Sequence, residues 1–593
     1  MTKTILLSLL LAFTLVVQAQ TDLIQNIAGR QTTSLNGTWQ ILIDPLENGF
    51  YNHRYQEKEN GFFKNAKMQS PSDLIEYNFD ESYELQVPGD WNTQMEKLYY
   101  YEGTIWYKRS FDYDLKPNKR VFVHFGAVNY EAIVYLNGKK VGKHIGGYTP
   151  FNFEITDLLQ EKDNYLVVKA DNTRKREAIP TVNMDWWNYG GITRSVHLVE
   201  TEPTFIQDYF VQLKKGSQEE IQVNIQLSEA KAAEVQISIP ELNIEKGVFT
   251  DQSGKANFTL TAQPELWSPA APKLYDVQLQ LGDQRLTDRI GFRTIETKGY
   301  QILLNGEPIF LKGICAHEEA PFGPGRATSR AEYEVLVDWA KDLGCNFMRL
   351  AHYPHSEEMV KVAEEKGILL WSEIPVYWTV LFENPDTYAN AERQLEEMIA
   401  RDKNRTNIIL WSVANETPPG DARLAFLTKL AQRVKQLDDT RLTTAALDNH
   451  SSGDGYNLID DELGKALDVV GINHYCGWYF NQPENCAGGK WKIDFEKPLI
   501  ISEFGGGALQ GYNGERNERW TEEYQDAVYE YNLAMFDNIE FMAGMTPWLL
   551  TDFLSPRRNL KKIQNDYNRK GLISEEGIKK KAFYRLRDYY KKR

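Results

Sequence analysis

Apolar and polar residues alternate along the first half of the chain with the period of two that is typical of β-strands. Between about residues 30 and 200 the segments RVFVHFGAV, YEAIVYLNGKKVGKHIGGY and NYLVVKADN carry this pattern. The Asn-Gly pair at 137–138 predicts a hairpin turn, because both residues tolerate a positive φ. Regularly spaced strands such as EIQVNIQLS and KLYDVQLQLG follow. We expect an all-β sandwich over residues 20–200 and a smaller immunoglobulin-like β sandwich over 201–296.

The pattern changes after residue 296, where apolar runs alternate with amphipathic helical segments such as HSEEMVKVAEEKG and ARLAFLTKLAQRVKQL. Eight apolar strands, most of them followed by helices, are typical of a (β/α)8 barrel. We therefore expect residues 297–593 to form a TIM barrel. The eight runs are IFLKGIC, CNFMRLAHYP, ILLWSEIP, IILWSVANE, TRLTTAALD, LDVVGINHY, PLIISEFG and AGMTPWLLTDF.

Composition limits the kind of partner. The chain has 593 residues, too many for one hydrophobic core, and a formal net charge of −16 at pH 7. This charge argues against nucleic acid, whose phosphates it would repel, and against a basic membrane-binding face. The 14 Trp and 32 Tyr supply flat faces on which sugar rings can stack, although aromatic residues also fill cores.

The start of the chain has the features of a signal peptide. Lys3 precedes the apolar run ILLSLLLAFTLVV, which is too short to span a bilayer comfortably, and the small residue Ala19 offers a cleavage site. We expect a signal peptide over residues 1–19 and export to the periplasm or the medium. The alternative is a buried N-terminal helix. No Cys follows the cleavage region, so we expect no membrane anchor.

The four cysteines give no sign of a metal site. Cys315 and Cys345 lie in apolar runs and are expected to be buried thiols. Cys476 and Cys486 share one predicted loop and could form a disulfide, but nothing in the sequence requires it. Since no Cys or His spacing indicates zinc, we expect neither a metal nor another cofactor.

Polar residues recur at the carboxyl end of nearly every predicted barrel strand, where the chemistry of such barrels lies. Each alone is compatible with a satisfied interior group, and Glu416 alone is compatible with a helix cap, but their shared position predicts a pocket. In chain order they are His317 and Glu318, Arg349 and His352, Glu373, Asn415 and Glu416, Asp448 and His450, Asn473 and Tyr475, Glu503, and Trp548 and Asp552.

The residue types in this pocket favour glycosidic chemistry. The sequence has no Ser-His-Asp order at a nucleophile elbow, no phosphate-binding glycine loop and no metal triad. Two carboxylates about 5 to 5.5 Å apart can cleave a glycosidic bond with retention. Strands four and seven lie across the barrel mouth from each other, so we expect Glu416 and Glu503 to form this pair. Glu373 is a weaker candidate, because its neighbours Ile374 and Pro375 offer little hydrogen bonding.

Two segments carry a resemblance to a known family. DKNRTNIILWSVANE (402–416) resembles the acid/base signature of glycoside hydrolase family 2, and NFMRLAHYPHSEEMVKVAEEKGILLW (346–371) resembles its other signature. Leu350, Glu364 and Asn407 depart from the usual residues, at positions that concern packing. The resemblance covers essentially the whole mature chain and implies a multidomain fold: a β jelly-roll sandwich, an immunoglobulin-like β sandwich and a TIM barrel.

The resemblance also implies residue roles. Glu416 would be the acid/base, Glu503 the nucleophile, and Asn415 a hydrogen-bond partner of the sugar 2-hydroxyl. An acid must hold a proton that the nucleophile lacks. We therefore expect a raised pKa for Glu416 and a lower pKa for Glu503, held by donors such as Tyr475.

Three segments resemble β-glucuronidases: NHYCGWY (473–479), the sandwich loop DWWNYGGITR (185–194), and YNRKGL (567–572). In the third, Asn568 and Lys570 match a pair that binds the glucuronate carboxylate, although a plain polar turn is the alternative. An ammonium and an amide would form charge-assisted hydrogen bonds that a neutral galactose cannot return. The predicted substrate-binding residues are Asn415, Asp185, His317, His352, Asn473, Tyr475, Tyr479, Trp548, Asn568 and Lys570.

We expect a retaining, exo-acting hydrolase that removes terminal β-linked glucuronic acid from acidic oligosaccharides or conjugates, with a family 2 β-galactosidase as the alternative. The presence of both Glu416 and Glu503 argues against a catalytically silent sugar-binding protein. An endo-acting hydrolase would need an open groove, which the sequence cannot show. The basic segment SPRRNLKK (555–562) would either contact a further acidic unit or be solvated. The sequence leaves open whether the chain forms a homo-oligomer.

Overall fold

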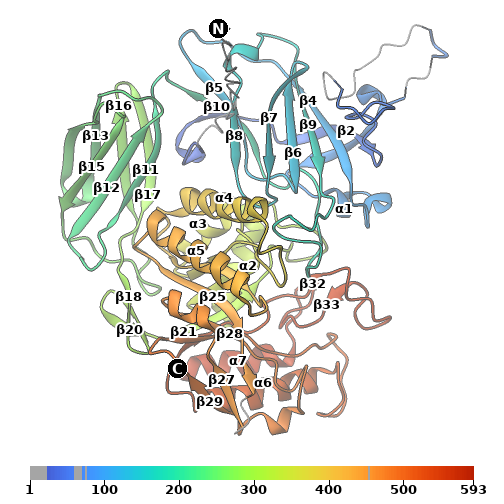
Figure 1. Ribbon diagram of the computed structural model, residues 1–593, viewed down its shortest axis with the longest axis vertical. Helices are drawn as coiled ribbons and strands as arrows, with labels where there is room; N and C mark the ends of the chain where they lie inside the picture. The colour runs from blue at the N-terminus through green and yellow to red at the C-terminus, as the bar shows by residue number, and fades with distance from the viewer. Residues whose placement is uncertain (1–22, 59–69, 74–75, 452–454) are drawn as a thin grey trace, which may run out of the picture.

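A computed structural model describes residues 23–58, 70–73, 76–451 and 455–593, which form two β-sandwiches and a barrel in chain order (Figure 1). The predicted signal peptide, residues 1–19, lies outside these residues. No helix in the described part of the chain combines the length and the apolar character needed to cross a membrane.

The first sandwich consists of two antiparallel sheets. The larger sheet has the strand order β3-β2-β4-β9-β6-β7 and the smaller the order β1-β10-β5-β8. Apolar side chains from both, such as Trp39, Val123 and Val134, form one buried core. This confirms the sandwich that the period-two pattern predicts. The strands are β1 Gln31–Ser34, β2 Gly37–Asp44, β3 Tyr83–Val87, β4 Thr104–Phe111, β5 Arg120–Phe125, β6 Glu131–Leu136, β7 Lys139–Ile145, β8 Phe151–Glu154, β9 Asn164–Asp171 and β10 Val196–Thr201, and the short helix α1 is Trp91–Gln94.

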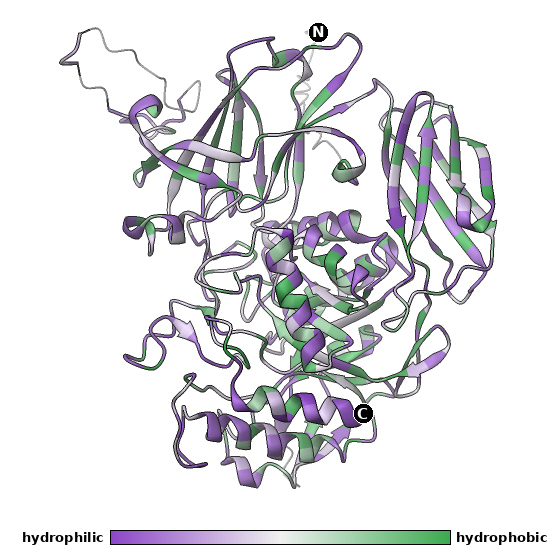
Figure 2. Cartoon of the chain, turned by 180° about the vertical axis from the view of Figure 1, so that it is seen from behind, coloured by the Kyte–Doolittle hydropathy of each residue, from purple (hydrophilic) through white to green (hydrophobic). Residues whose placement is uncertain are grey.

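The second sandwich pairs the sheets β11-β12-β15 and β14-β13-β16-β17. Along β12 every second side chain, from Ile221 to Leu227, is buried, and Figure 2 shows this alternation as green and purple bands. The immunoglobulin-like β sandwich is therefore confirmed. Its strands are β11 Ile206–Leu213, β12 Glu220–Leu227, β13 Glu234–Ile239, β14 Ile244–Phe249, β15 Lys255–Thr261, β16 Tyr275–Leu281 and β17 Gln284–Ile290.

The rest of the chain forms a closed barrel of eight parallel strands, β21-β22-β23-β24-β25-β28-β30-β31, in which β31 pairs with β21. Each strand coincides with one of the eight apolar runs, because strands buried on both faces have few polar residues; β21 ends one residue after its run and β31 begins one residue before its run. The barrel strands are β21 Leu311–Ala316, β22 Phe347–Leu350, β23 Leu369–Glu373, β24 Ile408–Asn415, β25 Leu442–Asp448, β28 Val470–Asn473, β30 Leu499–Glu503 and β31 Met542–Met545.

Helices cover the outside of the barrel. α2 begins with a capping box between Ser329 and Glu332 and ends at Gly344, whose φ of 91° is a left-handed conformation that favours glycine. Between β25 and β28 the described residues form no α-helix. The helices are α2 Arg330–Leu343, α3 Glu357–Glu365, α4 Pro385–Asp402, α5 Asp421–Leu437, α6 Glu522–Phe536 and α7 Lys581–Lys592, and the remaining strands are β18 Ile295–Lys298, β19 Gln301–Leu304, β20 Glu307–Ile309, β26 His450–Ser451, β27 Tyr456–Ile459, β29 Lys490–Ile493, β32 Phe553–Leu554 and β33 Tyr567–Asn568.

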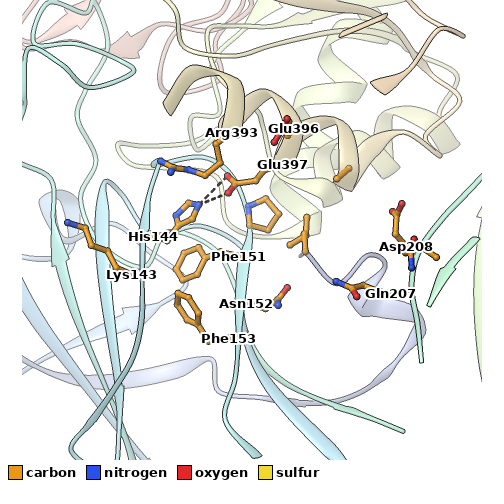
Figure 3. A pocket seen from close by; sticks show the side chains of 14 residues that line it. Lys143, His144, Phe151, Asn152, Phe153, Gln207, Asp208, Arg393, Glu396 and Glu397 are labelled. Atoms are coloured by element: carbon orange, nitrogen blue, oxygen red, sulfur yellow. Dashed lines mark hydrogen bonds and ion pairs between the residues drawn. The ribbon is translucent and has the colours of Figure 1, made fainter. Parts of the chain in front are cut away.

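The first sandwich is attached to the barrel by buried polar contacts. His144 Nε2 of β7 lies 3.1 Å from both carboxylate oxygens of Glu397 on α4, beside a cavity of about 330 Å³ that is also lined by Gln207 and Asp208 of the second sandwich (Figure 3). Arg194 Nη2 lies 2.9 Å from Glu318 Oε2, just beyond β21. The Arg194 contact holds the segment between β9 and β10, which contains residues 185–194, against the barrel.

Candidate active site

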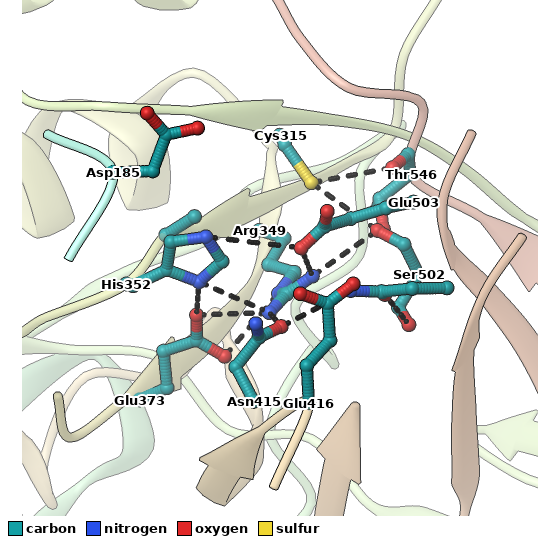
Figure 4. Close-up of polar contacts among 12 residues, drawn as sticks. Asp185, Cys315, Arg349, His352, Glu373, Asn415, Glu416, Ser502, Glu503 and Thr546 are labelled. Atoms are coloured by element: carbon teal, nitrogen blue, oxygen red, sulfur yellow. Dashed lines mark hydrogen bonds and ion pairs between the residues drawn. The ribbon is translucent and has the colours of Figure 1, made fainter. Parts of the chain in front are cut away.

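One buried arginine connects the ends of four barrel strands. Arg349 at β22 donates from Nη1 to Glu503 Oε1 over 2.9 Å, and from Nη2 to Glu373 Oε1 over 3.1 Å and to Asn415 Oδ1 over 2.7 Å. Its side chain is fully buried. Figure 4 shows Glu373, Asn415, Glu416 and Glu503 gathered around this guanidinium. The structure thus brings together the carboxylates that the sequence places at separate strand ends.

Glu503 is the more deeply buried member of the proposed catalytic pair, with 4% of its surface exposed. Its Oε2 accepts a hydrogen bond of 2.6 Å from the Tyr475 hydroxyl. Burial raises the pKa of Glu503 to about 8; Arg349 and Tyr475 oppose this, and the negative charge of Glu416 adds to it. The expected lower pKa of Glu503 is therefore wrong, because burial outweighs the donors.

Glu416 is held by two donors that face each other across its carboxylate. Trp378 Nε1 donates to Oε2 over 2.8 Å, and Asn473 Nδ2 donates to Oε1 over 2.9 Å. The alternative role of Glu416 as a helix cap does not hold, since α5 starts at Asp421 with Gly420 as its N-cap residue and no capping side chain. Its carboxylate is thus directed to the barrel mouth by residues from β28 and the loop after β23.

Asn415 retains an unused donor. Its Oδ1 accepts from Arg349 and, over 3.2 Å, from Asn473 Nδ2. Its own Nδ2 is buried and has no hydrogen-bond partner among the residues that the structure describes. Buried donors normally have partners, so this amide group is suited to a substrate oxygen.

Glu373 is well supplied with hydrogen bonds, contrary to the expectation from its sequence neighbours. Besides Arg349, it accepts from Trp371 Nε1 over 2.8 Å and lies 2.9 Å from His352 Nδ1. Burial alone would raise the pKa of Glu373, but Arg349 and His352 outweigh it and hold this pKa at about 2. Arg349 and His352 come from β22 and the residues after it, and Trp371 comes from β23 itself, two residues before Glu373; none of the three is Ile374 or Pro375. Glu373 therefore orients Arg349 and His352 as a fixed anion.

The histidines and Trp548 form an aromatic wall. His352 stacks on Trp548 with ring centroids 4.8 Å apart, and the His317 ring lies 5.3 Å from the same indole. Trp186, from the first sandwich, packs 5.7 Å from His352. Burial lowers the pKa of both histidines, which keeps their imidazoles neutral at pH 7. These aromatic rings close one side of the site, and one of them, Trp186, is contributed by the first sandwich.

Lys570 is a buried ammonium, with 3% of the residue exposed. Its Nζ lies 5.2 Å from the ring centroid of Tyr479 and 5.8 Å from that of Tyr475. Burial lowers the pKa of Lys570 well below its usual value; the positive charge of Arg558 lowers it further, and Glu503 and Glu416 act in the opposite direction. Among the described residues no carboxylate lies within ion-pair distance of this Nζ.

Asn568 lies two residues before this lysine and accepts a hydrogen bond from its backbone N–H, and Asp185 contacts Asn568. Asn568 Nδ2 is 3.3 Å from Asp185 Oδ2, and the same carboxylate accepts from Ser555 Oγ over 2.6 Å and is paired with Arg558. Asp185 thus reaches the barrel mouth, as the resemblance implies, but its oxygens are already engaged by the segment between β32 and β33. Its position fixes Asn568 and Arg558.

Tyr479 lies at the entrance, with 60% of its surface exposed. The loop that carries Tyr475 and Tyr479 is closed by a disulfide between Cys476 and Cys486, which settles the alternative that the sequence left open. Cys315 and Cys345 are free and buried, as predicted.

Sequence reasoning missed Trp378, Trp186 and Arg558. Trp378 follows the third strand, at the end of the barrel where site residues lie, but a tryptophan at that position is equally compatible with the hydrophobic core. Trp186 adjoins Asp185 in a segment that the resemblance singles out. Nothing in the sequence pairs Arg558 with Asp185, since 373 positions separate them.

Comparisons with known proteins agree with this architecture. The description "Glycosyl hydrolases family 2, sugar binding domain" matches residues 32–203, "Glycosyl hydrolases family 2" matches 204–293, and "Glycosyl hydrolases family 2, TIM barrel domain" matches 295–592. The β-glucuronidase of Paenibacillus borealis is 25% identical over 615 residues, which span 94% of this chain and 96% of that protein.

Solved structures lead to the same family. A β-glucuronidase from an uncultured Clostridium species superimposes with a TM-score of 0.81 at 26% identity, over 96% of this chain and 99% of that chain. The family 2 β-galacturonidase of Eisenbergiella tayi, bound to galacturonate, superimposes with a TM-score of 0.78 at 25% identity, over 97% and 99% of the two chains. With all three domain descriptions matched in order, this chain belongs to glycoside hydrolase family 2.

Proposed function

We propose that this protein is a retaining, exo-acting β-glucuronidase. Glu503 attacks the anomeric carbon while Glu416 protonates the departing glycosidic oxygen, which gives a covalent glycosyl-enzyme. Glu416 then removes a proton from water, the water oxygen attacks the same carbon, and Glu503 leaves as a carboxylate. Two inversions give net retention of the anomeric configuration.

The charges and pKa shifts around Glu416 and Glu503 are compatible with these two reaction steps. Because the pKa of Glu503 is raised to about 8, the coupled carboxylates hold one proton at neutral pH, which is the number the first step requires. The productive arrangement has this proton on Glu416. Arg349 and Tyr475 favour it, since both donate to Glu503 and stabilise its carboxylate form.

Asn415 is assigned to the sugar 2-hydroxyl. Its unpartnered Nδ2 is buried next to the carboxylate of Glu416 on the same strand end. A hydrogen bond to the 2-hydroxyl strengthens as positive charge develops on the ring, so it contributes more to the transition state than to binding.

The observation that carries the choice of sugar is the buried amino group of Lys570, which has no carboxylate partner among the described residues. Keeping a charge out of water without a partner is costly, and a substrate carboxylate would remove that cost. Asn568 lies in the same turn, where Asp185 fixes its amide. A β-galactoside has a neutral hydroxymethyl group at this position and would leave the ammonium unpaired. The names of the relatives support the same choice.

The enclosure of the site supports exo action. The segment that carries Asp185 and Trp186 lies against the barrel mouth, and the disulfide-closed loop lies beside Lys570. Glu503 and Lys570 are almost completely buried. Such depth suits one terminal sugar better than the interior of a polymer, which needs a groove open at both ends.

The test compares nitrophenyl β-glucuronide, β-galacturonide and β-galactoside as substrates of the wild type and of Lys570→Met, with Lys561→Met as a control that removes an exposed lysine. We expect the wild type to prefer the glucuronide, and Lys570→Met to lower kcat/KM about 100-fold, as loss of a charge-assisted hydrogen bond predicts. A better galactoside rate together with a neutral Lys570→Met would refute the uronic-acid assignment.

We also propose that the protein is exported and acts on acidic oligosaccharides. The signal-peptide pattern of residues 1–19 supports export, and so does the disulfide, because such bonds persist in oxidising compartments. N-terminal sequencing of the protein from the producing cells should begin at residue 20. A start at residue 1 on intracellular protein would contradict export.

A further inference from the structure

We propose that Arg557 forms a subsite for the leaving group, and that this subsite takes a sugar bearing a carboxylate or a sulfate. The inference rests on the proposed function and deepens it, because it specifies the sugar on the other side of the cleaved bond. The leaving-group side is defined by Glu416, which must reach the glycosidic oxygen to protonate it.

Contacts of Trp378 place Arg557 on that side. The Trp378 indole N–H is bonded to Glu416 Oε2, and the Arg557 guanidinium carbon lies 4.6 Å from the centroid of the same ring. The positive charge of Arg557 also acts on the phenol of the buried Tyr377, where it partly offsets the burial that raises the pKa of this group. The guanidinium therefore stands above the acid/base, at the entrance.

Arg557 is held in place but its charge is not neutralised. Asn183 Oδ1, from the first sandwich, accepts from Nη1 over 2.7 Å, and the Trp378 ring holds the guanidinium. No ion pair to a carboxylate is found for Arg557 within the described ranges, whereas the adjacent Arg558 is paired with Asp185. A fixed guanidinium with free N–H groups matches the geometry of carboxylate and sulfate oxygens.

The negative charge of the protein explains why an unpaired cation at this place would help binding. The chain carries a net charge of −16, and the one negative charge that the pair Glu416 and Glu503 retains at neutral pH would also repel an acidic oligosaccharide. Lys570 offsets the charge of the terminal uronate only. A second anionic sugar needs a cation of its own, and Arg557 is exposed next to the point where that sugar would leave.

The experiment uses disaccharides in which β-glucuronic acid is linked to the same second sugar in neutral, sulfated and carboxylated forms. The enzymes are the wild type, Arg557→Gln and the matched control Lys561→Gln, which removes an exposed cation from the same segment. For each enzyme the rates are expressed relative to nitrophenyl β-glucuronide. Comparing the sulfated with the carboxylated disaccharide shows which of the two anionic groups Arg557 recognises.

We expect the wild type and Lys561→Gln to prefer at least one anionic disaccharide about tenfold in kcat/KM, and Arg557→Gln to lose that preference, as removal of one charge-assisted hydrogen bond predicts. The preference should weaken with ionic strength. Equal loss on neutral and anionic disaccharides would show a structural role for Arg557 and overturn the inference. If the wild type hydrolyses nitrophenyl β-glucuronide but shows no preference for an anionic disaccharide, only this inference is overturned. If the wild type does not hydrolyse nitrophenyl β-glucuronide at all, the proposed function is overturned as well.

Discussion

The indole N–H of Trp378 donates a hydrogen bond of 2.8 Å to Oε2 of Glu416, and both residues have a left-handed backbone, with φ of 54° and 47°. Residues other than glycine rarely adopt this conformation, and where they do it often accompanies a functional site. Trp378 N also donates to Asn415 O over 2.9 Å. The ends of β23 and β24 are thereby joined, and the joint orients the carboxylate that we assign as the acid/base.

Trp378→Phe removes this hydrogen bond while it keeps an aromatic ring. We expect kcat/KM to fall about 10- to 100-fold for a substrate with a poor leaving group, the effect of losing one hydrogen bond to a charged group. A dinitrophenyl glucuronide, whose leaving group needs little protonation, should lose much less. Steady-state kinetics with both substrates measure the difference. An equal loss on both would mean that Trp378 acts on binding rather than on Glu416.

Glu416→Gln and Glu503→Gln should differ in their dependence on the leaving group. Loss of the acid should lower kcat/KM by about 10² to 10⁴ for a poor leaving group, and by less for dinitrophenyl glucuronide. Loss of the nucleophile should remove activity on both substrates, because no glycosyl-enzyme can form. If Glu503→Gln showed the stronger dependence on leaving group, the two roles would have to be exchanged.

The pH dependence follows from the raised pKa of Glu503. The pair holds its last proton up to about pH 8, so kcat/KM of the wild type should decline as the pH rises through about 8, where the acid form is lost. In Glu416→Gln the nearby negative charge is gone, which lowers the pKa of Glu503. Activity on dinitrophenyl glucuronide should then rise with pH, at values below 8, as Glu503 becomes a carboxylate.

The control for Glu416→Gln is the pH profile of the wild type on dinitrophenyl glucuronide. A declining limb near pH 8 that persists in Glu416→Gln would not belong to the carboxylate pair. It would belong to another group that titrates in the site, and Lys570, whose pKa burial lowers, is the one to test next with Lys570→Met.

Contacts between the first sandwich and the barrel should contribute to stability. Glu397→Ala leaves His144 and Thr149, whose Oγ1 donates to Glu397 Oε2 over 2.5 Å, without this partner in a buried contact. We expect a loss of about 1–3 kcal/mol and a fall in Tm of about 1–3 °C by calorimetry. The control is Glu396→Ala on the same helix, which breaks a partly exposed pair with Arg433 and should change Tm little. Equal Tm shifts in Glu397→Ala and Glu396→Ala would contradict a special contribution of the buried Glu397 contacts to stability.

The fold could be predicted because local sequence patterns determine its elements. IILWSVANE reads as a strand buried on both faces, and β24 occupies residues 408–415 of that run. The position of Glu416 and Glu503 at strand ends follows from the same pattern, since parallel strands present their carboxyl ends at one rim.

Contacts between distant residues could not be predicted in the same way. Two partners of Glu373, Arg349 and His352, lie 24 and 21 positions away along the chain, so its immediate neighbours are a poor guide to its environment. The direction of the Glu503 pKa depends on how deeply the tertiary fold buries it. A sequence shows the residue type but not the extent of burial.

The disulfide between Cys476 and Cys486 should stabilise the loop that carries Tyr475 and Tyr479. Closing a loop of 10 residues contributes about 3 kcal/mol in the chain-entropy account. A reductant should therefore lower the Tm of the oxidised wild type and raise KM for nitrophenyl β-glucuronide, because Tyr479 stands at the entrance. The double variant Cys476→Ser/Cys486→Ser should show both changes without reductant and no further response to it. A reductant effect of equal size in the double variant would assign the response to another group, since Cys315 and Cys345 are already thiols.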